Sequence, residues 1–85
     1  MKLVGKLVRD NRIIRAEDIS EEDTGLPYRD RLETCFVKLC KKLDIPVPMW
    51  LKKNTKEFVS FRTTFFSKEQ FVENVNFDRF EMKLE

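Results

Sequence analysis

The chain has 85 residues, of which 41% are hydrophobic and 38% are charged, and 17 Lys/Arg against 15 Asp/Glu give a net charge of +2. Because a chain of this length buries only about 60 to 65% of its unfolded surface, we expect one domain over residues 1–85 with a single core. The sequence has no histidine, the residue that acid–base and metal chemistry most often recruit, and the near-balanced charge does not by itself predict nucleic-acid binding.

Several features indicate where the protein works. The longest apolar runs have three or four residues, far short of the roughly 20 that span a bilayer, and residues 1–10 lack the apolar core of a signal peptide. Cys35 and Cys40 lie on one predicted helix, which holds their Cα atoms about 8 to 9 Å apart, too far for a disulfide. Two free thiols are typical of a reducing compartment, so we expect a cytoplasmic protein with no membrane partner.

The N-terminal segment contains two short apolar runs around Asp-Asn at 10–11, a pair that tolerates the positive φ of a tight turn. This pattern predicts a β-hairpin. A two-residue loop would pair Leu7 with Ile14. It would also place Lys6 opposite Arg15, an unfavourable like-charge pair, so a bulge or another register stays open.

An acidic run follows the hairpin and has no apolar period, and Gly25 and Pro27 come soon after it. We therefore expect a connecting loop. Carboxylates can bind hard cations, but the run lacks the D-x-D-x-D-G spacing of a calcium loop, so we predict a solvated loop without a metal. The acidic residues are Glu17, Asp18, Glu21, Glu22 and Asp23.

Apolar residues at spacings of three and four predict one long amphipathic helix over 27–43. Pro27 suits its first turn, and Pro46 and Pro48 end it because they lack the N–H that a helix needs. The residues on the expected inner face are Tyr28, Leu32, Cys35, Phe36, Leu39, Cys40 and Leu43.

A second, short helix is predicted over 49–56, with Trp50 and Leu51 directed inward and a basic outer side. From 58 to 66 the pattern alternates with a period of two, which predicts a strand. We expect its inner face to hold Val59, Phe61, Thr63 and Phe65, and its outer face to hold Phe58, Ser60, Arg62, Thr64 and Phe66.

Ser67 and Gln70 form an S-x-x-Q capping box, which predicts a short helix over 68–74 with Phe71 and Val75 facing inward. Residues 77–84 alternate again, as in a half-solvated strand. We expect Phe80, Met82 and Leu84 on its inner side, and Phe77, Arg79, Glu81 and Lys83 on its outer side.

These elements predict an α+β fold in the order ββααβαβ. We expect a small, mainly antiparallel sheet of three or four strands, packed by one long amphipathic helix and two short helices.

Motifs that carry chemistry are missing from the sequence. With only two glycines there is no phosphate-binding loop, and there is no CxxC pair. Cys35 and Cys40 fall on the buried helix face without a histidine base, and Glu69 and Glu73 have the spacing of a solvated helix face. We therefore expect no catalytic, cofactor-binding or metal-binding residues, so the protein is not predicted to be an enzyme.

The remaining function is binding, and we expect a non-catalytic interaction module with a protein partner. Its candidate contact residues are the outward Phe58, Arg62 and Phe66 of the predicted strand, with Phe77, or else an exposed edge strand. The alternative is a small nucleic-acid-binding protein that uses the basic segment 38–56 and Arg62. The lysines of this segment are Lys38, Lys41, Lys42, Lys52, Lys53 and Lys56, and the last three are the candidate anion-binding residues.

Overall fold

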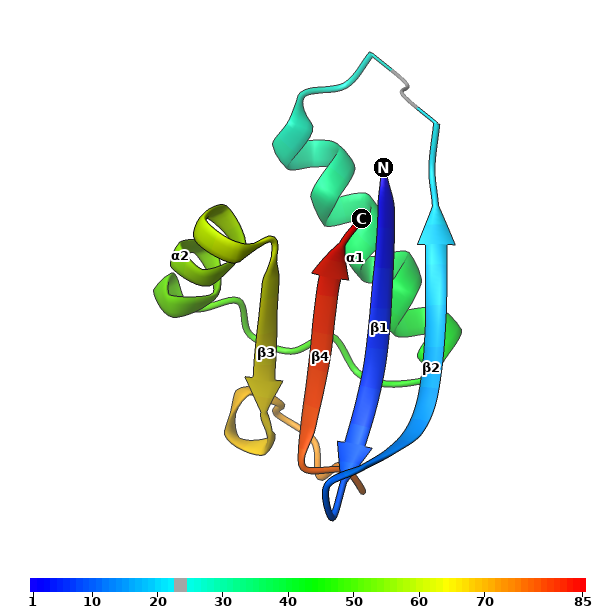
Figure 1. Ribbon diagram of the computed structural model, residues 1–85, viewed down its shortest axis with the longest axis vertical. Helices are drawn as coiled ribbons and strands as arrows, with labels where there is room; N and C mark the ends of the chain where they lie inside the picture. The colour runs from blue at the N-terminus through cyan, green and yellow to red at the C-terminus, as the bar shows by residue number, and fades with distance from the viewer. Residues whose placement is uncertain (23–24) are drawn as a thin grey trace.

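The computed structural model describes residues 1–22 and 25–85 and shows an α+β fold, with a four-stranded antiparallel sheet and two helices (Figure 1). The predicted class is confirmed. One single-turn 3₁₀ helix, η1, stands where a third helix was predicted, so the order ββααβαβ is not matched in full. The elements are β1 Lys2–Arg9, β2 Arg12–Ser20, α1 Tyr28–Leu43, α2 Lys52–Phe61, β3 Thr63–Ser67, η1 Lys68–Gln70 and β4 Arg79–Leu84.

The strand order is β2-β1-β4-β3, so the first and last strands pair in the centre of the sheet. Helix α1 crosses one face, behind the strands in Figure 1, and α2 lies beside the β3 edge. The core fills the space between α1 and the sheet, where the Phe36 ring stacks on Phe66 with ring centroids 5.4 Å apart. Its members include Leu3, Leu7, Phe36, Leu39, Leu43, Phe66, Phe80 and Met82.

Gly5 in β1 lies at a close approach between the sheet and α1. A Cβ atom at this position would lie 2.9 Å from the Phe80 ring and 3.0 Å from Leu39 and Leu43 of the helix. A side chain at this position would require the Phe80, Leu39 and Leu43 side chains to shift, and glycine avoids this.

The hairpin around 10–11 is confirmed, because φ is 53° at Asp10 and 63° at Asn11. Its register contains the bulge that the sequence left open. Ile14 is the extra residue, so that Leu7 lies opposite Arg15 and Lys6 lies opposite Ala16. The bulge thereby separates the two like charges that a regular register would pair.

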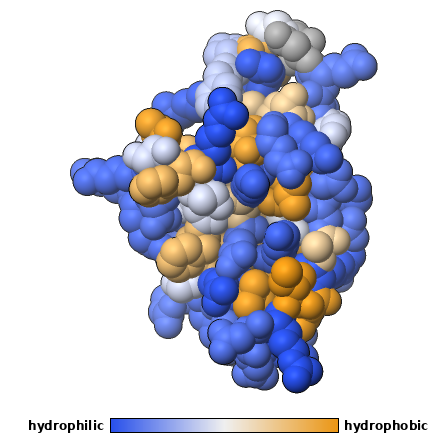
Figure 2. Space-filling view, in the orientation of Figure 1, coloured by the Kyte–Doolittle hydropathy of each residue, from blue (hydrophilic) through white to orange (hydrophobic). Residues whose placement is uncertain are grey.

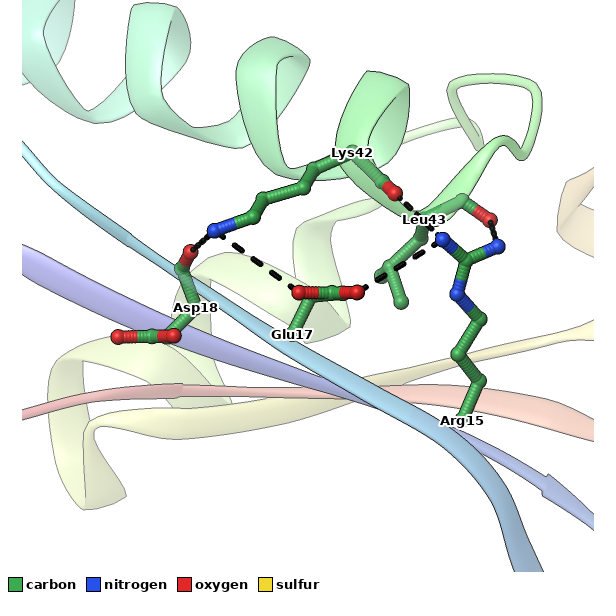
Figure 3. A network of polar contacts seen from close by, with 5 residues as sticks. All are labelled: Arg15, Glu17, Asp18, Lys42 and Leu43. Carbon is green, nitrogen blue, oxygen red and sulfur yellow. Dashed lines mark hydrogen bonds and ion pairs between the residues drawn. The ribbon is translucent and has the colours of Figure 1, made fainter.

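Helix α1 confirms the predicted long helix and ends in a left-handed residue, Asp44, whose φ is 58°. Its inner side chains Cys35, Phe36, Leu39, Cys40 and Leu43 are buried, whereas Tyr28 at its first turn is half exposed. Helices leave their last carbonyls without intrahelical partners. Here the Arg15 guanidinium of β2 donates to the carbonyls of Leu43, at 3.0 Å, and Lys42, at 2.9 Å (Figure 3).

The predicted acidic loop is corrected at its start, since Glu17 and Asp18 belong to β2. Lys42 of α1 donates to the backbone carbonyl of Asp18 at 2.8 Å and lies 3.8 Å from the Glu17 carboxylate (Figure 3). These two acidic residues therefore help to join strand to helix. Asp23, the last residue of the acidic run, lies outside the described residues.

The segment from 49 to 66 differs most from the prediction. The second helix begins three residues later and runs on through Phe61, and the strand starts only at Thr63. Arg62, with φ of 58°, ends the helix and turns the chain into β3. As a result Phe58 is buried from the helix, and the inner face of β3 holds Thr64 and Phe66.

In the C-terminal third the predicted helix and strand are both present, but each is shorter than predicted. The backbone N–H of Ser67 donates to Gln70 Oε1 at 3.1 Å, which confirms this half of the capping box, but the helix stops after one turn. Strand β4 is confirmed, with Phe80 and Met82 buried. Phe77 precedes this strand and is buried against Phe71, with ring centroids 5.3 Å apart, so its outward prediction is wrong.

Candidate interaction surface

Exposed apolar side chains gather where α2 meets β3. Val59 is 79% exposed and Phe61 is 71% exposed at the end of the helix, and Phe65 of the strand is 42% exposed. Figure 2 shows hydrophobic side chains over α2 and β3 on the sheet face away from α1. We call Phe61 and Phe65, with the hollow that both of them line, the α2–β3 surface. Its two phenylalanines were predicted to lie in the core, and the structure contradicts that prediction.

The hollow is a shallow depression of about 310 Å³. Its lining combines two aromatic rings, two hydroxyl-bearing side chains and two carboxylates, and consists of Glu57, Phe61, Thr63, Thr64, Phe65 and Glu81. Helix α2, strand β3 and the neighbouring β4 each contribute to it. A partner seated here would meet apolar surface with negative charge beside it.

A buried polar network fixes the floor of the hollow. The Thr64 hydroxyl donates to Glu57 Oε1 at 2.6 Å and accepts a hydrogen bond from Asn54 Nδ2 at 2.8 Å. Asn54 Nδ2 also donates to the Phe65 carbonyl at 3.1 Å. The helix that carries Val59 and Phe61 is therefore held to the strand that carries Phe65.

The same network reaches η1 through Gln70. Gln70 Nε2 donates to Asn54 Oδ1 at 3.0 Å and to the Met49 carbonyl at 2.9 Å. Asn54 Oδ1 also accepts from the backbone N–H of Leu51 at 2.9 Å, at the start of α2. The sequence analysis missed Asn54, although an asparagine three residues after a helix start is a recognisable signal. Leu51 itself is 42% exposed, contrary to its predicted inward orientation.

Charges of both signs surround the α2–β3 surface. Glu81 Oε2 accepts a hydrogen bond from Arg79 Nε at 2.7 Å. Lys53 Nζ lies 4.4 Å from the centre of the Phe65 ring and donates to the Phe65 carbonyl at 3.4 Å. The Lys53 ammonium over this ring shows that a cation can be accommodated there.

The predicted partner-binding face is not formed. Phe58, Phe66 and Phe77 are at most 5% exposed and belong to the core. The indole of Trp50 lies against both of the first two, with ring centroids 5.8 Å from Phe58 and 5.6 Å from Phe66. Among the four predicted contact residues only Arg62 is exposed, at the end of α2.

The lysines of the basic segment do not form one surface. α1 contacts β2, whereas α2 lies beside β3 at the opposite edge of the sheet (Figure 1). On α1, Lys38 donates to Glu21 at 2.6 Å, and this hydrogen bond raises the pKa of Lys38. The predicted anion-binding residues Lys52, Lys53 and Lys56 lie on the same helix as the exposed Phe61.

Both cysteines are free and buried. Burial raises the pKa of Cys40 to about 12, and burial followed by the Glu21 charge raises that of Cys35. Because the thiolate is the nucleophile, both thiols are held in their unreactive form. Among the described residues, no three Cys, Asp or Glu side chains are grouped as metal ligands.

Three comparisons with known proteins add nothing to this picture, because no family model, no curated protein and no solved structure matches the chain. Of the helices in the described part of the chain, none is both long and apolar enough to cross a membrane.

Proposed function

We propose that the chain is a non-catalytic interaction module that binds a protein partner through the α2–β3 surface. The observation that carries this proposal is the exposure of Phe61 and Phe65, which line the same hollow. The fold gains nothing from two large apolar side chains in water, whereas a partner gains by covering them. Free buried thiols support a reducing compartment, so we place the module in the cytoplasm.

The lining of the hollow suggests the chemistry of the partner. Glu57 and Glu81 lie beside Phe61 and Phe65, and each carboxylate has a single hydrogen bond within the described residues. An apolar segment with a basic side chain would cover the rings and bring its charge to these carboxylates. We therefore expect the partner to present an apolar residue next to a lysine or arginine.

The test compares variants in a screen of displayed peptides followed by affinity measurement. Covering one large apolar side chain contributes about 1.5 to 3 kcal/mol, so Phe61→Ser should weaken a selected peptide about 10- to 100-fold. Val72→Ser is the matched control, because Val72 is 91% exposed but lies outside this surface. Equal binding by Phe61→Ser, Val72→Ser and the wild type would refute the proposed surface.

A nucleic-acid partner is the second candidate, favoured by one observation. Helix α2 carries Lys52, Lys53 and Lys56 together with the exposed Phe61, and Lys53 lies over the Phe65 ring; cations close to aromatic rings suit phosphates and stacked bases. Binding of this kind weakens steeply as salt rises. Titration of single-stranded oligonucleotides should then show a salt-dependent affinity that Lys52→Glu/Lys53→Glu removes, and an affinity insensitive to salt would exclude it.

A further inference from the structure

The two edge strands of the sheet differ in how far their outer backbone groups are covered. At the β3 edge, the outward carbonyl of Phe65 accepts hydrogen bonds from Asn54 and Lys53 of α2. At the other edge, β2 is the outermost strand, and the helices in the described part of the chain do not run along its outer side, although the last turn of α1 lies behind it (Figure 1). An uncovered edge strand is a template for pairing with another chain. The outer edge of β2 is therefore available in principle for pairing with a strand of another chain.

The pairing of β2 with β1 shows which of its backbone groups point outward. Met1 and Glu21 exchange two backbone hydrogen bonds of 2.9 Å each. Such bonded pairs alternate along an antiparallel ladder, so Ile19, Glu17 and Arg15 are bonded to β1. The backbone groups of Ala16, Asp18 and Ser20 then point away from the sheet.

One of these outward groups is already occupied. The carbonyl of Asp18 accepts a hydrogen bond from Lys42 Nζ at 2.8 Å (Figure 3). The same ammonium lies 3.8 Å from the carboxylate of Glu17. Lys42 thus covers both a backbone acceptor and a charged side chain of the open edge.

The charges of β2 are arranged so that the strand complements a second copy of itself. Arg12 and Arg15 lie in its first half, and Glu17 and Asp18 lie in its second half. An antiparallel pair brings the basic half of one strand to the acidic half of the other. Parallel pairing would place like charges together, which is destabilising.

Symmetry and charge together favour a register centred on Ala16. In an antiparallel pair, residues directly opposite each other lie on the same face of the sheet. A two-fold axis normal to the sheet therefore passes midway between one residue and the same residue of the second copy. Centring it on Arg15, Glu17 or Asp18 would put identical charges opposite each other. Centring it on Ala16 puts Arg15 opposite Glu17 of the second copy, and the outward N–H and C=O of the two Ala16 residues can bond to each other.

We propose that the outer edge of β2 is complementary to the same edge of a second copy of this chain, and that Lys42 prevents this pairing in the wild type. The Lys42 ammonium occupies the Asp18 carbonyl, an outward backbone acceptor on the same edge as Ala16 that a second strand would use. This inference does not depend on the α2–β3 surface, which lies at the opposite edge of the sheet.

Removal of the Lys42 charge tests the proposal. Sedimentation velocity of Lys42→Met should show the mass rising with concentration from 10.3 kDa to twice that value, while the wild type stays at 10.3 kDa. Lys41→Met is the matched control, because Lys41 lies in the same helical turn and its side chain has no hydrogen bond or ion pair within the described residues. Lys42→Arg, which keeps the charge, should stay monomeric.

Two further measurements separate strand pairing from unfolding. The Ala16 amide should exchange fast in the wild type and be protected in the Lys42→Met dimer. Adding Ala16→Pro should return Lys42→Met to a monomer, because proline removes this outward N–H and is tolerated at an edge position. A monomeric Lys42→Met, a dimer with an unprotected Ala16 amide, or a wild type that already pairs through Ala16 would each overturn the proposal.

Discussion

Replacing Asn54 by alanine should be among the most damaging substitutions in this protein. The Asn54 side chain is fully buried and takes part in four hydrogen bonds, with Thr64, Phe65, Leu51 and Gln70. Each such bond contributes about 0.5 to 1.5 kcal/mol net. Some partners keep a second hydrogen bond in the variant, since Gln70 still donates to the Met49 carbonyl. We therefore expect the free energy of unfolding to fall by about 3 kcal/mol.

A loss of this size is large against the roughly 5 to 15 kcal/mol that stabilises a domain. Urea denaturation followed by tryptophan fluorescence is a suitable assay, because Trp50 lies against Phe58 and Phe66. The melting temperature should fall by about 12 to 24 °C. Asn74→Ala, at an exposed position, should change stability little. If Asn54→Ala loses less than about 1 kcal/mol, the polar network does not hold α2 to β3 as we argue.

Three further predictions concern other parts of the fold. Gly5→Ala should lose about 1 to 3 kcal/mol in chemical denaturation because its Cβ would lie 2.9 Å from the Phe80 ring; a neutral result would mean that α1 can move away. Asn11→Gly should gain about 0.5 to 1 kcal/mol in the same assay, since φ is 63° there, and a loss would contradict this account of the turn. Cys40 has a folded pKa of about 12 against an ordinary value of 9.0, so the thiol favours folding below pH 9 and this contribution falls as the pH rises toward 12. The stability of the wild type should therefore fall more steeply above pH 9 than that of Cys40→Ala, and parallel curves would refute the burial effect.

Local signals predicted the elements whose causes are local. The Asp10-Asn11 turn needs two residues with positive φ, and both have it. The spacing of apolar residues in α1 and the start of η1 at Ser67 also follow from neighbours within a few positions. The unfavourable pairing of Lys6 with Arg15 in a regular register also indicated that a bulge, now seen at Ile14, was possible.

The segment around Phe58 could not be predicted in the same way. Alternating aromatic and β-branched residues fit a strand, and the same residues fit a helix whose inner side holds Asn54 and Phe58. The helix is favoured because Asn54 meets Thr64 and Gln70, which are distant in sequence. Once α2 extends to Phe61, the strand begins later and its faces are fixed by the packing of Phe66 on Phe36.

The sequence by itself therefore determined the hairpin, the long helix, the last strand and the α+β class, because turn chemistry and periodicity act within single elements. The tertiary structure decided which phenylalanines are exposed and how each sheet edge is closed. A strand with apolar residues on both faces does not specify which face is buried, and a shift of one residue reverses the two. The contacts of Phe66 beneath α1 made that choice, and they left Phe61 and Phe65 on the outside.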